Sequence, residues 1–189
     1  KAYEGSLGLD NRGTKFNGPI QVNAGLSGNT IFKNYERIGL QSVVTTNTDE
    51  LQFFSGFYEQ PISSEGTKLF FSASFSDSKP GSALKDFEVA GESKTFALKI
   101  THPFIRSRAE NLTGSLSYTH RNSSTDILGT LDSEDRLRIV NLGLSYDFVD
   151  EYRGVNLVSF NLSKGFDIFD STKTGSENLT RNEGHSDFT

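Results

Sequence analysis

The side chains that usually carry catalysis or hold metal ions are few in this sequence and stand apart. His102, His120 and His185 lie at different connections, and none has a second metal ligand beside it. The acidic run at 132–135 lacks the spacing of a loop that wraps Ca²⁺. The serines have no base and orienting group at hand, as acyl transfer requires. We therefore expect no catalytic residue, no metal site, no cofactor and no enzymatic activity.

The composition excludes several further classes of protein. The 189 residues include no Cys, which excludes a disulfide scaffold and a thiolate metal site. The net charge is −5 and the basic residues are scattered, so we expect no nucleic-acid partner. No apolar run approaches the roughly 18 residues of a membrane helix, but membrane barrels are apolar on only one face of each strand. The lack of Met and of an N-terminal signal predicts a processed or excised piece of a longer chain.

Apolar and polar residues alternate with a period of two along most of the chain. In the segment 18–26, Ile20, Val22 and Leu26 fall on one face, with Gln21 and Asn23 on the other. Repeated alternation of this kind predicts antiparallel strands with one apolar face. The nine expected strands are 2–10, 18–26, 36–46, 50–59, 67–76, 94–102, 111–121, 136–149 and 154–166. The fourth has an ambiguous phase, because aromatic residues stand on both of its faces.

The polar faces of these strands are small and neutral. Gly, Ser, Thr and Asn dominate them, with few of the Lys and Glu residues that solvate a soluble sheet. Such side chains suit a crowded, water-filled interior, so we expect them to line a lumen. Lys99 supports this phase, because a lysine on the lipid side costs about 2–4 kcal/mol at the bilayer midplane. The candidate lumen-facing residues are Gln21, Asn23, Lys99, Thr101, Ser115, Ser117, Asn141, Ser159 and Asn161.

Connection lengths favour a membrane barrel over a soluble β-sandwich, a choice that alternation alone leaves open. Odd-numbered connections are often long and polar, and even-numbered ones are mostly short. The clearest examples are 76–94, 121–135 and 166–185 among the odd ones, and 60–66, 103–111 and 150–153 among the even ones. Outer-membrane barrels have long external loops and short periplasmic turns. We therefore expect an all-β, antiparallel transmembrane barrel whose apolar faces meet outer-membrane lipid. Aromatic girdles are expected from Tyr3, Phe57, Tyr58, Tyr118, Tyr146 and Phe148.

Five motifs in order along the chain carry a family resemblance. They are LDNRGTKFNGP at 9–19, FYEQP at 57–61 with EGT at 65–67, HPFIRSR at 102–108, SEDRLR at 133–138 and YRGVN at 152–156. With these motifs the chain resembles, over its whole length, the barrel of the haemolysin secretion/activation transporters, the ShlB/FhaC/HecB family of two-partner (type V) secretion.

The resemblance implies a sixteen-stranded barrel in the bacterial outer membrane, preceded by a plug helix and two periplasmic polypeptide-transport-associated domains. It implies that the full-length barrel, as a monomer, exports one large unfolded exoprotein, a haemolysin or an adhesin, without nucleotide hydrolysis. The plug, the periplasmic domains and the family's late Arg-Gly-aromatic loop motif have no counterpart here, because Arg153-Gly154 is followed by Val155 in a short turn. We therefore expect residues 1–189 to be a partial barrel domain of about nine strands, ending inside a tenth.

Other functions stay open at this point. A surface β-barrel or β-sandwich could bind a receptor through its long loops, as an adhesin does. A barrel-assembly insertase of the same superfamily is a second alternative. An outer-membrane lipase or protease ranks third, because the sequence offers no Ser-His or Asp-His pair.

Overall fold

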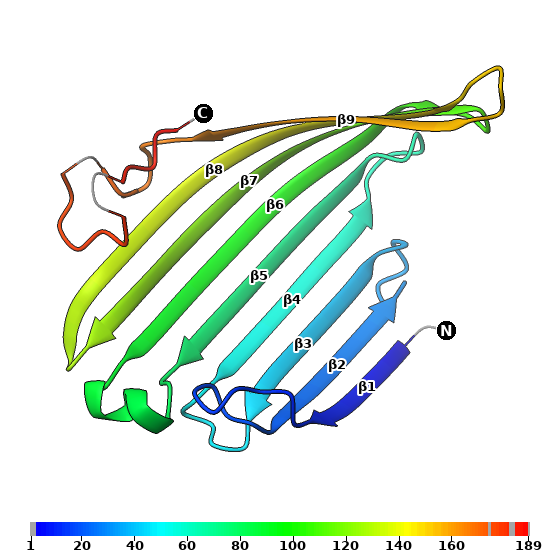
Figure 1. The fold of residues 1–189 in the computed structure, drawn as a ribbon. Coiled ribbons are helices and arrows are strands. Elements are labelled where there is room, and N and C mark those ends of the chain that lie inside the picture. The colour runs from blue at the N-terminus through cyan, green and yellow to red at the C-terminus, as the bar shows by residue number, and fades with distance from the viewer. Residues whose placement is uncertain (1–2, 174, 182–183, 189) are drawn as a thin grey trace.

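The structure is a computed structural model that describes residues 3–173, 175–181 and 184–188, and it consists of one antiparallel sheet. Nine strands follow one another in chain order, each paired with the next (Figure 1). Their bounds are Tyr3–Asp10 (β1), Gln21–Asn29 (β2), Arg37–Thr45 (β3), Gln52–Pro61 (β4), Lys68–Ser78 (β5), Ala90–Arg106 (β6), Glu110–Ile127 (β7), Thr130–Val149 (β8) and Val155–Gly165 (β9). A 3₁₀ helix, η1 (Ser82–Phe87), lies between β5 and β6. The expected all-β antiparallel fold is confirmed.

The sheet curls into a trough with β1 and β9 at its two edges (Figure 1). The connections after β1, β3, β5 and β7 gather at one end of the strands, here called the odd end. Those after β2, β4, β6 and β8 lie at the opposite, even end. Among the described residues, no helix is long and apolar enough to cross a membrane.

The sheet has no second layer and no apolar core. Within the described ranges no hydrophobic side chain is buried. Directly paired residues of antiparallel strands point to the same side, and the register places a row of apolar residues side by side on the convex, outer face: Leu69, Ile100, Leu116, Leu142 and Leu162. Leu142 is 50% exposed and Leu162 44%. A soluble sandwich would bury such a face against a second sheet, so the sandwich alternative is excluded.

Strands β6, β7 and β8 run well into segments that the sequence assigns to connections. The seventh connection, expected at 121–135, consists only of Leu128 and Gly129, with φ of 53° and 71°. The residues before and after this turn pair from Arg121↔Leu137 to Ile127↔Thr130. Ladder hydrogen bonds form between backbones whether or not one face is apolar, so the loss of alternation there marks the end of the apolar band and not the end of the strand. The expectation of a long seventh loop is wrong.

Two smaller differences concern β2 and β4. The second strand begins at Gln21 and not at residue 18, because Gly18 has a φ of +82° and Pro19 has no N–H to donate to a ladder. In β4 the register resolves the ambiguous phase. Tyr58 pairs with Ile38 on the outer face, whereas Phe57 pairs with Gly39 on the inner face. Aromatic residues therefore lie on both faces of β4.

Two turns at the even end are organised by carboxylates. The fully buried Glu36 side chain accepts backbone hydrogen bonds from Phe32 and Asn34, at 2.5 and 2.9 Å. Burial alone would raise the pKa of Glu36, but the backbone N–H donors, Phe32 first among them, hold it below its ordinary value. In the turn between β8 and β9, the Asp150 side chain likewise accepts a hydrogen bond from the Gly154 N–H. Both turns are therefore closed by an ionised acceptor.

Candidate conduit wall

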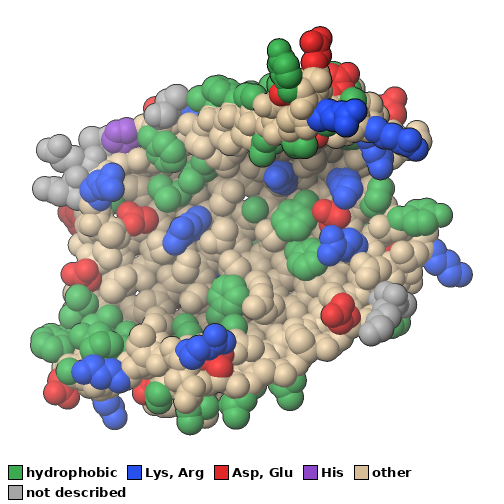
Figure 2. All heavy atoms as spheres, turned by 45° about the vertical axis from the view of Figure 1, so that its right-hand side comes forward, with side chains coloured by type: hydrophobic (Ala, Val, Ile, Leu, Met, Phe, Trp, Pro, Cys, Tyr) green, Lys and Arg blue, Asp and Glu red, His purple; other side chains and the backbone are tan. Residues whose placement is uncertain are grey.

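The concave, inner face of the sheet is the candidate functional surface. Figure 2 looks into the trough, whose surface is mostly backbone and side chains that are neither charged nor hydrophobic, with scattered charges and a few hydrophobic groups. All nine residues expected to face the lumen lie on this face. Paired residues of neighbouring strands point to the same side of the sheet, so the register places these nine together from strand to strand.

Six of these nine residues lie on two neighbouring rows across β5 to β9. One row aligns Lys68, Thr101, Ser115, Gly143 and Asn161. The next aligns Phe70, Lys99, Ser117, Asn141 and Ser163. The rows therefore bring hydroxyl and amide groups together from residues far apart in the sequence.

Hydrogen bonds and close approach hold this part of the wall together. Asn141 Nδ2 donates to Ser117 Oγ at 3.4 Å, and Ser163 Oγ donates to Asn141 Oδ1 at 2.6 Å. A Cβ at Gly143 would lie 2.7 Å from Ser115 Oγ and 3.1 Å from Asn161 Oδ1. Because residue 143 is a glycine, the two polar side chains can approach each other over it.

The other three candidates lie away from these rows. Ser159 pairs with Ser145 one row closer to the even end. Gln21 and Asn23 are on β2, where Asn23 Nδ2 donates to Asp10 Oδ2 at 2.9 Å. The structure thus brings Ser159 near the main group and leaves Gln21 and Asn23 on the opposite side of the trough.

Sequence reasoning missed an aromatic and charged cluster on the inner face. The rings of Phe57 and Phe70 stack with centroids 5.9 Å apart. Glu59 beside them lies 3.8 Å from Arg37 and 3.5 Å from Lys68. The sequence signal for this cluster was the presence of aromatic residues on both faces of the fourth strand. If only one face of that strand meets lipid, the aromatic residues on its other face must point inward.

The outer face at the even end carries aromatic residues, as a membrane boundary requires. Tyr146 and Phe148 stack at 5.0 Å, and the Tyr146 hydroxyl donates to Glu110 at 2.9 Å. Phe104 joins them: a register shift between Pro103 and Ile105 leaves it 62% exposed. Two girdle expectations are wrong. Phe57 lies on the inner face, and Tyr118 lies mid-strand with a buried hydroxyl that has no partner among the described residues.

At the odd end, Arg138 fastens the segment that follows β9. Its side chain is only 2% exposed and donates to Phe169 O at 3.0 Å and to Asn122 Oδ1 at 2.9 Å. Arg136 pairs with Asp170 of the same segment. Gly165 donates to Phe188 O, so the chain returns to the edge of β9 after this excursion. No group of three or more His, Asp or Glu side chains that could hold a metal ion occurs in the described part of the chain.

Comparison with known proteins assigns this sheet to a family. The whole chain, residues 1–189, matches the family described as haemolysin secretion/activation protein ShlB/FhaC/HecB. The chain belongs to this family. Proteins of the ShlB/FhaC/HecB family are outer-membrane proteins.

Solved structures agree with the fold of this ShlB/FhaC/HecB chain. CdiB from Escherichia coli is 20% identical, with a TM-score of 0.80, and the match covers 93% of this chain and 34% of that one. CdiB from Acinetobacter baumannii is 18% identical, with a TM-score of 0.64, covering 88% of this chain and 32% of that one. The chain thus spans about a third of the length of these structures. No curated protein matches it.

Proposed function

We propose that this chain forms part of the wall of an outer-membrane conduit that exports a large unfolded exoprotein, a haemolysin or an adhesin, in two-partner secretion. Residues 1–189 contribute nine strands to a larger barrel, which closes as a monomer. The export step needs no nucleotide and no cofactor. Membership of the ShlB/FhaC/HecB family supports this proposal, and the character of the inner face supports the mechanism.

The observation that carries the mechanism is the small, neutral, polar inner face. Residues such as Ser115, Ser117 and Asn161 offer both donors and acceptors to a passing backbone. Water makes nearly equivalent bonds to the same groups, so exchange between water and backbone costs little in either direction. An extended chain therefore finds transient partners without a deep energy well. We propose that folding of the cargo outside the cell drives its net movement.

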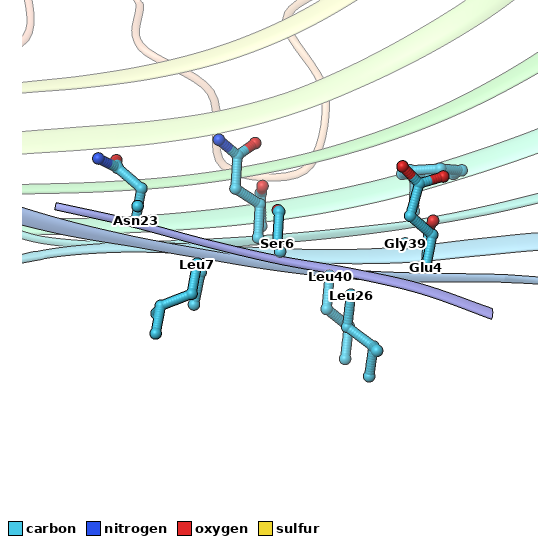
Figure 3. Close-up of a pocket in the computed structure, with 14 residues that line it drawn as sticks. Glu4, Ser6, Leu7, Asn23, Leu26, Gly39 and Leu40 are labelled. Carbon is cyan, nitrogen blue, oxygen red and sulfur yellow. The ribbon is translucent and has the colours of Figure 1, made fainter.

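The separation of the two faces supports the same proposal. In β1 to β3, Leu7, Leu26 and Leu40 point away from the trough, whereas Glu4, Ser6 and Asn23 point into it (Figure 3). Apolar contacts with lipid hold the sheet in the membrane, and the polar face stays wetted. The nine candidate residues, from Gln21 to Asn161, act in this proposal as wall and not as catalysts.

Grafting tests the proposal directly. Residues 1–189 replace the matching segment of a full-length family member, and secreted cargo is scored in the medium beside the unmodified parent. We expect export at a rate within a few-fold of the parent. A graft that folds and reaches the outer membrane but exports nothing would contradict the assignment. Surface binding of cells without export would favour the adhesin alternative instead.

A further inference from the structure

A hollow of about 570 Å³ lies in the inner face over β1 to β4 (Figure 3). Its floor contains Gly8, Gly25 and Gly39, which carry no side chain to fill it. A Cβ at Gly25 would lie 2.7 Å from Ser6 Oγ, and one at Gly39 would lie 2.2 Å from the Phe57 ring. The glycines therefore leave room for the side chains of Ser6 and Phe57 to lie over the floor. The hollow is large enough for one long side chain.

The walls of the hollow combine one aromatic ring with uncharged polar side chains. Phe57 supplies the apolar wall, and Ser6, Gln41 and Ser55 line the rest with polar atoms. Asn23 uses its amide nitrogen on Asp10, which leaves its carbonyl oxygen as an acceptor. The polar part of the wall can therefore accept hydrogen bonds from a ligand that brings donors.

Glu4 gives the hollow its charge. It points to the same side as Ser6 and Asn23 (Figure 3) and is exposed. It forms no ion pair with any residue that the structure describes, in contrast to Glu59, which has two basic partners. With no cation beside it among the described residues, this carboxylate is complementary to a positive ligand.

We propose that this hollow binds a lysine or arginine side chain of an extended polypeptide in transit, a proposal that rests on the proposed function. The aliphatic stem of such a side chain packs along Phe57, and its charged head reaches Glu4 and the nearby oxygens. The hollow thus supplies a weak binding site for basic side chains on a wall whose other side chains are mainly small and uncharged.

Peptide binding to the full-length protein in detergent tests the ligand class. The probes are two labelled peptides, one of Gly-Ser-Lys repeats and one of Gly-Ser-Gln repeats. We expect Glu4→Gln to weaken binding of the lysine peptide about fivefold and to leave the glutamine peptide unchanged. Glu4 has no hydrogen-bond or ion-pair partner among the described residues, so the variant keeps its fold. Glu151→Gln, in the exposed turn after β8, is the matched control. Equal affinities for the lysine peptide in all three proteins would overturn the proposal.

Crosslinking during export tests the location. A photoreactive residue replaces Ser55 in the hollow or, as control, Ser145 on the inner face of β8, while export is measured in the same cells. We expect Ser55 to give cargo adducts at sequences that contain Lys or Arg, and Ser145 to give adducts without that preference. If export continues but adducts form only with the protein's own chain, or not at all, the proposed binding of basic side chains is wrong. Loss of export in every variant would instead count against the proposed function.

Discussion

At the scale of single residues, glycine positions decide where other side chains of the inner face can lie. Gly39 is the clearest case, because its missing Cβ is the space that Phe57 occupies. Gly143 does the same for Ser115 and Asn161. The inner surface therefore depends on the absence of side chains as much as on their chemistry.

Gly39→Ala tests this dependence. We expect a loss of about 1–3 kcal/mol in the free energy of unfolding, because the new methyl group overlaps the Phe57 ring. Unfolding of the full-length protein in urea measures it. Gly5→Ala is the control, since the nearest atom to its Cβ lies at 3.9 Å. A loss of the same size in Gly5→Ala would show that the effect is general to strand glycines.

Asp150 makes the turn between β8 and β9 sensitive to acid. Hydrogen bonds from Asn156 and from the Gly154 N–H hold its pKa below the ordinary value. A depressed folded pKa gives stability that is present above the unfolded pKa of about 3.9 and is lost as pH falls through the folded pKa. We expect amide exchange at Gly154 to lose protection below about pH 4. In Asp150→Asn this pH dependence should vanish; if it persists, another group is responsible.

At the scale of elements, the strands separate an apolar outer face from a polar inner face, and neighbouring residues of β8 test whether only the outer face meets lipid. Leu144 is on the outer face, 43% exposed, and Ser145 is on the inner face. We expect Leu144→Arg to destabilise the folded protein by up to about 4 kcal/mol, the upper cost of an arginine on the lipid side of a barrel strand. Ser145→Arg should cost far less, because its charge stays in water.

Unfolding of the two arginine variants in lipid vesicles measures the difference. Leu144→Ile serves as the control for the change in shape alone. Equal destabilisation by both arginines would mean that the two faces of β8 are not distinguished by lipid.

At the scale of the whole molecule, all odd-numbered connections between strands lie at one end of the sheet and all even-numbered ones at the other. We expect the odd end to face the cell exterior, since the longer polar hairpins and the segment after β9 extend from it. An epitope inserted between Leu128 and Gly129 should bind antibody on intact cells. One inserted between Arg108 and Ala109 should bind only after permeabilisation, and the reverse result would invert the orientation.

The strands, their order and the direction of most side chains could all be predicted from the amino-acid sequence. Alternation with a period of two is a local property, so residues such as Leu142 and Asn141 fix the two faces of β8 without knowledge of any neighbour. The same argument assigned Lys99 and Ser117 to the polar face. The family resemblance rested on short motifs at the connections, which are local as well, and the family match confirms it.

The ends of the strands, and the side chains that become neighbours across the sheet, depend on the tertiary structure. Polar residues of 121–135 extend a hairpin because their backbones find partners, which the hydropathy pattern does not record. The hollow joins Glu4 to Phe57, residues more than fifty positions apart in the chain, through the registers of three strand pairs. Alternation gives the side of the sheet on which a residue lies. Its neighbours on that side are set by pairing, twist and curvature, which arise only when all the strands come together.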